Sequence, residues 1–363
     1  MPTIKAAVCR QFGQPLVIEE LVLDEPAARE VMVDIKACAI CHSDIFFAEG
    51  AWGGDLPAVY GHEAAGIVSA VGPGVEGFAP GDQVVVTLIR FCGDCHYCRR
   101  GQAITCEEVF SRDANGPLLE ADGGAVFQAL RTGAFAEKAL VHESQVVKVP
   151  RDIPFPVASL LACGVITGFG AVTNTARVRE GDTVAVIGCG GVGLNSIQGA
   201  RISGARAIVA LDIDDGKLEA ARRFGATHAF NPTRDDAAAE IMKITEGRGI
   251  DHAFVAVGAK AAFDTAFSWI GRFGQLVVVG MPPSGVMAEY DPGTMAAWNQ
   301  RILGSKMGET TIATDIPMLV DLYREGRLLL DQLVTRTYRL DEINEAIAEV
   351  NAGRALRNVI VFD

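Results

Sequence analysis

The sequence lacks a long apolar run. No stretch reaches the roughly 18 consecutive apolar residues of a membrane-spanning helix, and the segment before Arg10 has no long apolar stretch. Low-complexity tracts and internal repeats are absent too, which argues against a disordered chain and a repeat protein. We therefore expect a cytoplasmic protein with no membrane partner.

The sequence has fewer basic than acidic residues. The chain has 32 lysines and arginines against 45 aspartates and glutamates, which gives a formal net charge of −13. A charge of this sign repels nucleic-acid phosphates and anionic lipid headgroups. We therefore expect no nucleic acid among the partners.

Glycine and cysteine, in contrast, are plentiful. A chain of 363 residues can bury two separate cores, and its 40 glycines suit an α/β protein with tight turns and nucleotide-binding loops. The nine cysteines of a cytoplasmic protein sit in a reducing compartment, where clustered thiols more often bind metal than form disulfides. Cysteine spacing is therefore informative.

The pattern of apolar residues changes along the chain. Residues 1–162 alternate β-rich runs such as VMVDIKA and GDQVVVTLI with Gly and Pro turns, which predicts a β-rich, barrel-like domain. From Gly181 onward strands alternate with helices, as in TVAVIG followed by a helical stretch from Gly191 to Ser203. Repeated βαβ units predict a parallel, doubly wound sheet.

The last part of the chain turns helical again. Leu340, Ile343, Ile347 and Val350 share one helix face, and Gly353 is placed to end that helix. The strand NVIVF follows, and we expect it to return to the β-rich domain.

A glycine-rich loop follows the apolar strand from Thr183 to Ile187 and precedes a helix, in the pattern G-x-G-x-x-G. The first glycine permits the tight turn, the second lets the backbone approach a pyrophosphate, and the third lets helix and strand pack closely. The alternative is a plain Gly-rich turn, but Asp212 ends the next strand where an acid binds adenosine ribose hydroxyls. We predict a Rossmann dinucleotide site formed by Gly188, Gly190, Gly191, Val192, Gly193 and Asp212.

Negative charge at the end of that strand favours NAD as the cofactor. The Asp212 carboxylate would repel the 2′-phosphate of NADP, and Asp214 and Asp215 add further negative charge. Lys217 is a candidate partner for the ribose.

Four cysteines follow the spacing C-x2-C-x2-C-x7-C. Four thiolates on one loop can close a tetrahedral shell, which predicts a structural zinc bound by Cys92, Cys95, Cys98 and Cys106. His96 competes for one of these places. A nucleic-acid zinc ribbon is the alternative, and the acidic composition and the dinucleotide loop argue against it.

Two further sequence patterns suggest sites that the rest of the sequence does not support. The sequence CAICH from Cys38 matches a haem attachment site, and His62-Glu63 resembles the start of a zincin helix. Haem attachment belongs to exported proteins, and no second histidine follows at the zincin spacing. Cys41, His62 and Cys163 are too distant in sequence to form a local motif, and each alone suggests a buried side chain.

Taken together, the segments resemble the zinc-containing medium-chain dehydrogenase/reductase superfamily over nearly the whole chain. The match is to its alcohol dehydrogenase branch, near the glutathione-dependent formaldehyde and aryl or benzyl alcohol dehydrogenase types. The matching segments are CHSD, GHEAAGIVSAVGPGV, the four-cysteine segment, CGVITG, GCGGVG and RNVIVF. The resemblance implies a GroES-like, β-rich catalytic domain (1–162 and 305–363) and an NAD-binding Rossmann domain (163–304).

The resemblance also implies roles for single residues. Cys41, His62 and Cys163 would bind a catalytic zinc, so that each chain holds two zinc ions. Ser43 would accept the alcohol proton, Asp44 would orient His62, and Glu63 would lie behind the metal. Thr167 and Val192 would line the nicotinamide, and His42 and Arg357 would contact the pyrophosphate.

The expected function is the reversible, NAD-linked oxidation of a primary apolar or aromatic alcohol to the aldehyde. Phe46 stands where many members carry a relay histidine, so the proton route differs, and Phe46 and Leu88 are candidate pocket walls. The alternative substrate is S-(hydroxymethyl)glutathione or another thiol adduct, although GAWGGDLP lacks the acidic pair expected for it. A remote alternative is a non-catalytic relative. By resemblance, Met281 to Ser305 forms the edge of a homodimer, or of a homotetramer.

Overall fold

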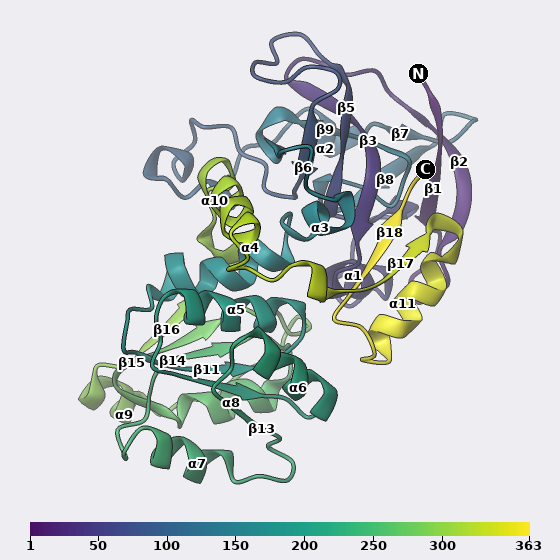
Figure 1. Cartoon of the computed structure of the whole chain (residues 1–363). Coiled ribbons are helices and arrows are strands. Elements are labelled where there is room, and N and C mark those ends of the chain that lie inside the picture. The colour runs from purple at the N-terminus through teal and green to yellow at the C-terminus, as the bar shows by residue number, and fades with distance from the viewer. The chain divides into compact units, whose positions relative to one another are not determined.

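The chain forms two compact units. The computed structural model describes residues 1–363 apart from the side chain of Asn115 (Figure 1). Unit 1 contains Met1–Cys163, Thr311–Tyr323 and Leu330–Asp363; unit 2 contains Gly164–Thr310 and Arg324–Leu329. The domain limits expected above stay a prediction.

A small closed barrel forms one part of unit 1. Its strand order is β1-β2-β7-β8-β4, and β4 closes it by pairing with both β1 and β8. The strands are β1 (Thr3–Cys9), β2 (Val17–Leu23), β4 (Ala58–Val59), β7 (Leu118–Leu119) and β8 (Ala125–Gln128). The β-rich, barrel-like architecture expected of this part of the chain is confirmed.

A seven-stranded sheet forms the other part of unit 1. Its order is β10-β6-β5-β3-β18-β17, with β9 also pairing with β3. The strands are β3 (Glu30–Ala39), β5 (Glu63–Val71), β6 (Gln83–Val86), β9 (Lys138–His142), β10 (Val146–Lys148), β17 (Val334–Arg339) and β18 (Arg357–Val361). Because β18 pairs with β3, the end of the chain returns to the β-rich unit, as expected.

Helices connect these strands. They are α1 (His42–Ala48), α2 (Arg112–Asn115), α3 (Phe155–Leu160), α10 (Ile312–Arg324) and α11 (Ile343–Asn351). The last helix begins at Ile343, whereas the apolar pattern included Leu340, which lies in a 3-10 turn and packs against the core. Gly353, with φ +74°, follows the C-cap residue Ala352 and takes the left-handed conformation that ends many helices.

Unit 2 is a six-stranded sheet of parallel strands in the order β13-β12-β11-β14-β15-β16. This is the doubly wound order of dinucleotide-binding domains, in which the chain reverses direction beside the first strand. The strands are β11 (Thr183–Ile187), β12 (Ala207–Leu211), β13 (His228–Phe230), β14 (Ile250–Val255), β15 (Ile270–Val278) and β16 (Arg301–Gly304). The predicted parallel, doubly wound sheet is confirmed.

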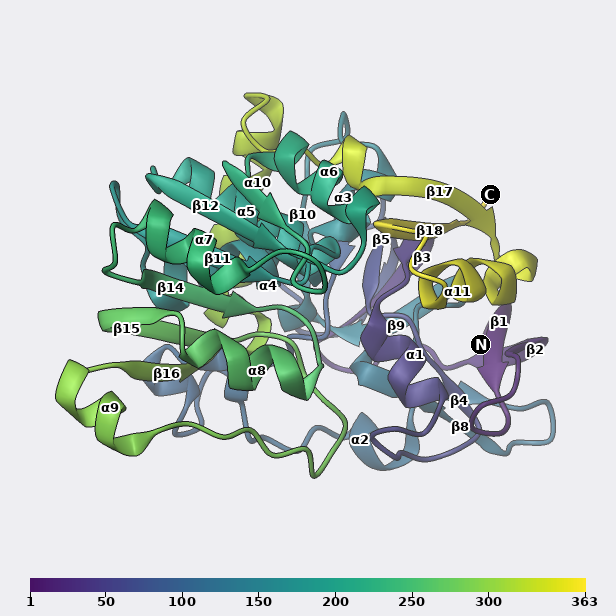
Figure 2. The same ribbon diagram turned by 90° about the horizontal axis from the view of Figure 1, so that it is seen from below.

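Helices cover both faces of this sheet, with α5 and α8 on opposite faces (Figures 1 and 2). Side chains of α7 and α8 share one apolar core with alternate strand residues such as Val209 and Val255. The helices are α4 (Gly164–Gly170), α5 (Gly191–Ile202), α6 (Asp215–Phe224), α7 (Ala237–Ile244), α8 (Lys260–Phe267) and α9 (Pro292–Trp298).

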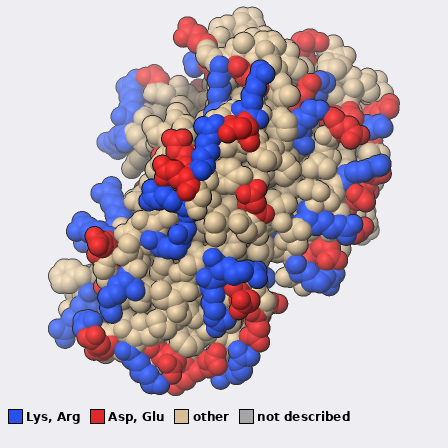
Figure 3. Space-filling view, in the orientation of Figure 1, with Lys and Arg blue, Asp and Glu red and all other residues tan. Residues whose placement is uncertain are grey.

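The surface carries charges of both signs. On the face drawn in Figure 3, lysines and arginines are interspersed with aspartates and glutamates. This face is therefore mixed in charge and does not form one basic field. Among the described residues, no helix is both long enough and apolar enough to cross a membrane.

We predict that Phe135→Ala destabilises unit 1. Phe135 is among the largest fully buried side chains, and truncating a buried phenylalanine costs about 3–5 kcal/mol because it leaves a cavity. Denaturant unfolding should show this loss. Val17→Ala is the control, since Val17 is 46% exposed and its loss should change stability by less than about 0.5 kcal/mol. Equal losses in both variants would contradict the assignment of Phe135 to the core.

Candidate active site

His62 is held by a buried carboxylate. Its Nδ1 lies 2.8 Å from the Asp44 Oδ1 atom, and both side chains are buried. A carboxylate at that position keeps the proton on Nδ1 and leaves the Nε2 lone pair free, as in metal-bound histidines. Nε2 is buried and has no hydrogen-bond partner among the described residues. The ring therefore presents a free donor atom to the interior.

The turn before His62 requires glycine. Gly61 has φ +93°, and a Cβ atom there would lie 2.6 Å from the backbone nitrogen of Phe135. Its N–H donates to Asp44 Oδ1 at 2.9 Å. No role for Gly61 was expected from the sequence, although its place directly before His62 is a signal for one.

Cys41 lies at the start of α1, directly after β3. Its backbone N–H donates to Asp44 Oδ2 at 3.1 Å, so the same carboxylate caps the helix. A hydrogen bond from Cys163 holds the pKa of the Cys41 thiol well below its usual range, and His62 contributes in the same direction against the effect of burial. The same hydrogen bond raises the pKa of the Cys163 thiol well above its usual range, so ionisation is favoured at one cysteine of the pair.

These residues form one buried cluster. Cys41, His62, Glu63 and Cys163 each place a ligand atom within 4.8 Å of the others, although they come from three distant parts of the sequence. Two thiols and an unpartnered imidazole nitrogen match the donor set that zinc takes in catalytic sites, where three protein ligands leave one position open. The donor atoms thus fit a zinc ion.

Arg357 and Glu63 form an ion pair beside this cluster. The Arg357 Nη2 donates to Glu63 Oε1 at 2.9 Å and Nη1 donates to the Ile40 carbonyl at 3.2 Å, with both side chains buried. Burial raises the pKa of Glu63 to about 8 against the opposing charge of Arg357. The sequence did not indicate this pairing, and the expected contact of Arg357 with a pyrophosphate stays a prediction.

His42 and Ser43 occupy the first turn of α1. His42 is exposed and its ring meets the Phe46 ring edge-on at 6.5 Å, whereas Ser43 is half-buried. Phe46 packs in turn against Trp52. The catalytic roles expected for His42 and Ser43 stay predictions.

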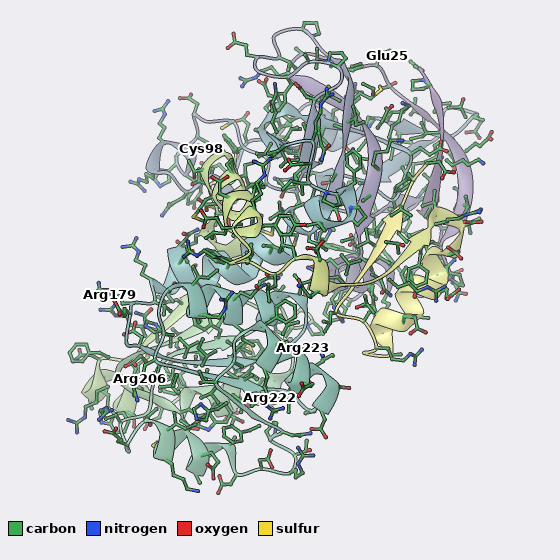
Figure 4. All side chains as sticks on the ribbon, in the orientation of Figure 1. Glu25, Cys98, Arg179, Arg206, Arg222 and Arg223 are labelled. Carbon is green, nitrogen blue, oxygen red and sulfur yellow. The ribbon has the colours of Figure 1, made fainter. Side chains whose placement is uncertain are left out.

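The four-cysteine loop forms a second cluster, and Cys98 is labelled on it in Figure 4. Three of its sulfur–sulfur distances are 3.7, 3.9 and 3.9 Å. Ligands at about 2.3 Å from a tetrahedral zinc lie about 3.8 Å apart, so the spacing fits a closed Zn–S₄ shell. Backbone hydrogen bonds, the largest from Cys98, lower the pKa of Cys95 to about 6. His96 contacts the Arg100 side chain and does not belong to the cluster.

The glycine loop of unit 2 has the geometry of a phosphate cradle. Gly188 has φ +93°, a Cβ atom at Gly193 would lie 1.8 Å from the Gly188 carbonyl, and Gly190 has no neighbour within 4 Å of a Cβ position. Gly191 and Val192 begin α5. The open side at Gly190 leaves room for a ligand against the backbone, so the loop fits a dinucleotide.

Asp212 lies at the end of β12 beside this loop. Its carboxylate accepts the N–H of Cys189 at 2.7 Å and that of Asp214 at 3.0 Å. Asp214 caps α6 and Asp215 pairs with Arg234, so both have structural partners. The charge of Lys217 acts on the Cys189 thiol, which places Lys217 near the loop as well.

Thr167 lies on α4, which packs closely on α5. A Cβ atom at Gly168 would be 2.1 Å from the Val192 carbonyl, so Thr167 and Val192 sit on helices in direct contact. The residues of unit 2 predicted to bind a cofactor therefore lie on adjoining segments, and their binding roles stay predictions.

A cavity of about 370 Å³ lies in unit 1. Phe47 and Leu130 contribute to its wall, whereas Phe46 and Leu88, the pocket walls expected from the sequence, are not among its described lining residues. The cavity was missed because its residues come from separated loops that share no sequence motif.

Two family models match the chain. Residues 27–151 match the "alcohol dehydrogenase GroES-like domain", and residues 191–324 match the "zinc-binding dehydrogenase" domain. The chain belongs to the zinc-containing alcohol dehydrogenase family. The resemblance noted in the sequence is thereby confirmed. The chain is an oxidoreductase of the alcohol dehydrogenase type.

Relatives of this dehydrogenase match it along their full length. It is 37% identical to the NDMA-dependent alcohol dehydrogenase of Amycolatopsis methanolica, covering 98% of each chain. It is 34% identical to the S-(hydroxymethyl)glutathione dehydrogenase of Paracoccus denitrificans, covering 99% of each. The crystal structure of benzyl alcohol dehydrogenase from Acinetobacter calcoaceticus superposes with a TM-score of 0.93 at 34% identity, covering 100% of each.

We predict two zinc ions per chain, one in each cluster. Elemental analysis should give two for the unmodified dehydrogenase and one for His62→Ala, whose four-cysteine shell is intact. Under chelator, the ion that remains in His62→Ala should leave more slowly than the other, because its shell is closed. One zinc or none in the unmodified dehydrogenase would contradict the assignment.

Proposed function

We propose that this dehydrogenase catalyses the reversible, NAD-linked oxidation of a primary alcohol with an apolar or aromatic body. The observation that carries the proposal is the buried cluster of Cys41, His62 and Cys163, with its unpartnered His62 Nε2 atom. We assign these residues to a catalytic zinc and Cys92, Cys95, Cys98 and Cys106 to a structural zinc. When bound, the catalytic zinc would polarise the alcohol oxygen and the nicotinamide would accept hydride.

The residues around the cluster set its charge. With zinc bound, the thiolates of Cys41 and Cys163 would cancel its formal charge, and the Asp44 carboxylate holds the His62 ring. Arg357 balances Glu63 at 2.9 Å, so the second carboxylate adds little net charge. The Asp44 carboxylate is then the remaining formal charge of the set, and its hydrogen bonds with Cys41, Gly61 and His62 stabilise it.

Ser43 is the residue we assign to take the alcohol proton. It stands two residues after Cys41 in the first turn of α1, and His42 precedes it. Phe46 cannot accept a proton, so the proton leaves through water or through the exposed His42 imidazole. This route distinguishes the chain from members with a histidine at that position.

NAD is the cofactor that unit 2 favours. Gly188, Gly190 and Gly193 shape the loop, Val192 and Thr167 are assigned to the nicotinamide, and Asp212 to the ribose. Lys217 is a second ribose partner, and the negative charge of Asp212 disfavours the 2′-phosphate of NADP. One relative is NDMA-dependent by name, so the acceptor needs a direct test.

S-(hydroxymethyl)glutathione is the second candidate substrate. The relative from Paracoccus denitrificans, which bears that name, favours it. The relative named benzyl alcohol dehydrogenase favours an aromatic alcohol, and so does the aromatic cavity wall. We therefore rank the aromatic alcohol first.

We also propose a cytoplasmic homodimer formed through residues 281–305. Strand β16 is at the edge of the sheet in unit 2, and apolar side chains nearby are exposed, among them Met281, Met287 and Trp298. An exposed apolar patch next to a sheet edge is typical of an interface. A tetramer would need a second interface.

We predict that the zinc-loaded dehydrogenase reduces NAD⁺ with benzyl alcohol and longer primary alcohols, and reduces NADP⁺ much less. Absorbance of the reduced nicotinamide measures both rates, and S-(hydroxymethyl)glutathione is the comparison substrate. A clear preference for the glutathione adduct would favour the second candidate. Turnover that needs NDMA in place of added NAD⁺ would contradict NAD as an exchanging acceptor.

We predict that Asp212→Gly changes the preference between NAD⁺ and NADP⁺. It should weaken NAD⁺ binding and improve NADP⁺ binding, because it removes a ribose hydrogen bond and a charge that repels phosphate. An unmodified enzyme that already prefers NADP⁺ would show that Asp212 does not set the choice.

We predict that Ser43→Ala lowers kcat by about 10²- to 10⁴-fold, the usual contribution of a positioned proton acceptor. Ser43→Thr keeps the hydroxyl and should retain most activity. Steady-state kinetics at saturating NAD⁺ distinguish the two variants, and zinc content should be unchanged in both. A normal kcat for Ser43→Ala would exclude the assigned role.

A further inference from the structure

The 370 Å³ cavity of unit 1 is lined by residues that lie close in the chain to the proposed zinc site. Phe47, in its wall, lies one helical turn after Ser43 on α1, and residues four apart share a helix face. Tyr60, also in the wall, comes two residues before His62. An alcohol whose oxygen is held at the zinc site can therefore place its body in this cavity.

Part of the wall is apolar. The rings of Phe47 and Tyr60 stack with their centroids 6.4 Å apart, and Ala129 and Leu130 contribute further apolar surface. Such a wall suits an aromatic or alkyl body. The rest of the lining is unusual for an enzyme of apolar alcohols, because it contains three arginines, Arg90, Arg112 and Arg131.

Arg90 is buried, and one of its guanidinium nitrogens has no hydrogen-bond partner among the described residues. Only 7% of the residue is exposed, its Nη2 donates to Asp113, and its guanidinium carbon lies 4.1 Å from the centre of the Phe110 ring. Its Nε has no hydrogen-bond partner among the described residues. Burial lowers the pKa of Arg90 and the charge of Arg131 adds to this effect, whereas the Asp113 carboxylate opposes it.

Arg112 and Arg131 differ in whether their guanidinium groups already bind other side chains. Arg112 is fully engaged, since it binds Glu30 at 3.0 Å and also pairs with Asp24. The exposed side chain of Arg131 makes no hydrogen bond or ion pair with any residue whose side chain the structure describes. Its charge nevertheless reaches Arg90 and Asp113.

The backbone that carries Arg131 is strained. Leu130 has φ +53° and Arg131 has φ +60°, a left-handed conformation that is costly for residues with a side chain. Strain of this kind persists where the surrounding fold holds side chains in a required position, and it clusters at binding sites. The wall therefore holds two adjacent non-glycine residues in place, one apolar and one basic.

Two carboxylates of the lining, Asp113 and Asp55, face the charges of Arg90 and Arg131. Asp113 is occupied, because its Oδ2 also accepts the backbone N–H of Phe110 at 2.8 Å. Asp55 is exposed at the wall and is the one lining carboxylate that opposes an incoming anion. A planar guanidinium binds a carboxylate with two parallel hydrogen bonds, which makes the arginines specific for this group.

We propose that the substrate is an alcohol with an aromatic or alkyl body and a carboxylate at the end remote from the hydroxyl, and that Arg131 and Arg90 bind this carboxylate. The proposal rests on the proposed alcohol oxidation and names its substrate class. Phe47 and Leu130 contact the body, and Asp55 limits how strongly anions bind.

The test compares 4-(hydroxymethyl)benzoate with 4-(hydroxymethyl)benzamide, which has the same shape and no charge. The unmodified enzyme should prefer the carboxylate by about tenfold or more in kcat/KM, the usual worth of a charge-assisted hydrogen bond. Arg131→Gln should remove most of this preference and leave the benzamide unchanged. Oxidation of both alcohols without a preference would overturn the proposal, and oxidation of neither would instead overturn the proposed function.

Three further variants test whether the preference for the carboxylate depends on the Arg131 guanidinium or on net charge alone. Arg131→Lys keeps the charge but loses the planar fork, so it should retain part of the preference. Asp55→Asn should raise the preference for the carboxylate, in the direction opposite to Arg131→Gln. Lys5→Gln makes the same change in net charge at an exposed site on β1 and should have no effect. An equal loss in Lys5→Gln would overturn the proposal by showing a general charge effect.

Binding without turnover provides a second readout. 4-Methylbenzoate has the carboxylate but no hydroxyl, and isothermal titration should detect its binding to the unmodified enzyme. The affinity should fall about tenfold or more in Arg131→Gln and weaken with added salt. Equal affinity in the two proteins would exclude Arg131 as the carboxylate ligand.

Discussion

The site depends on one buried carboxylate, that of Asp44. Its two oxygens accept the backbone N–H groups of Cys41 and Gly61 and meet Nδ1 of His62. Two chain segments are thereby tied together: the start of α1, and the turn before β5 that carries the His62 ring. Removing the carboxylate would leave buried donors without partners and would release the ring, so structural and electrostatic roles cannot be separated at this residue.

The buried ionisable groups around Asp44 compensate one another. Two thiols, an imidazole, two carboxylates and a guanidinium lie together in the interior of unit 1. Burying so many ionisable groups is costly unless each is paired or coordinates a metal. Arg357 pairs with Glu63 and His62 pairs with Asp44, whereas the buried His62 Nε2 atom has no hydrogen-bond partner among the described residues. This unpartnered atom is why we propose a divalent cation as the partner that completes the set.

The sequence predicted the parts of the molecule that follow local rules. The glycine loop between β11 and α5, the four-cysteine loop and the parallel sheet of unit 2 all depend on residues close together in the chain. The cluster at Cys41, His62 and Cys163 could be assigned only by resemblance, because no local pattern links residues so far apart. The ion pair of Glu63 with Arg357 gave no signal, since it joins the first residues of β5 and β18. Leu340 was misplaced because its apolar character fits both a helix face and a capping turn.

The residues that set the chemistry and those that set specificity differ in how the fold holds them. Cys41 and His62 stand next to regular elements, α1 and β5, and a shared carboxylate fixes them. Leu130 and Arg131 stand instead in a short 3-10 turn between strands, Ala129–Arg131, whose left-handed backbone no residue preference would predict. Loops tolerate exchange of side chains without loss of the core, so one catalytic framework can serve many substrates. Arg131 belongs to no sequence motif. Its position is what matters, because it brings an exposed guanidinium to the cavity wall that Arg90 also lines.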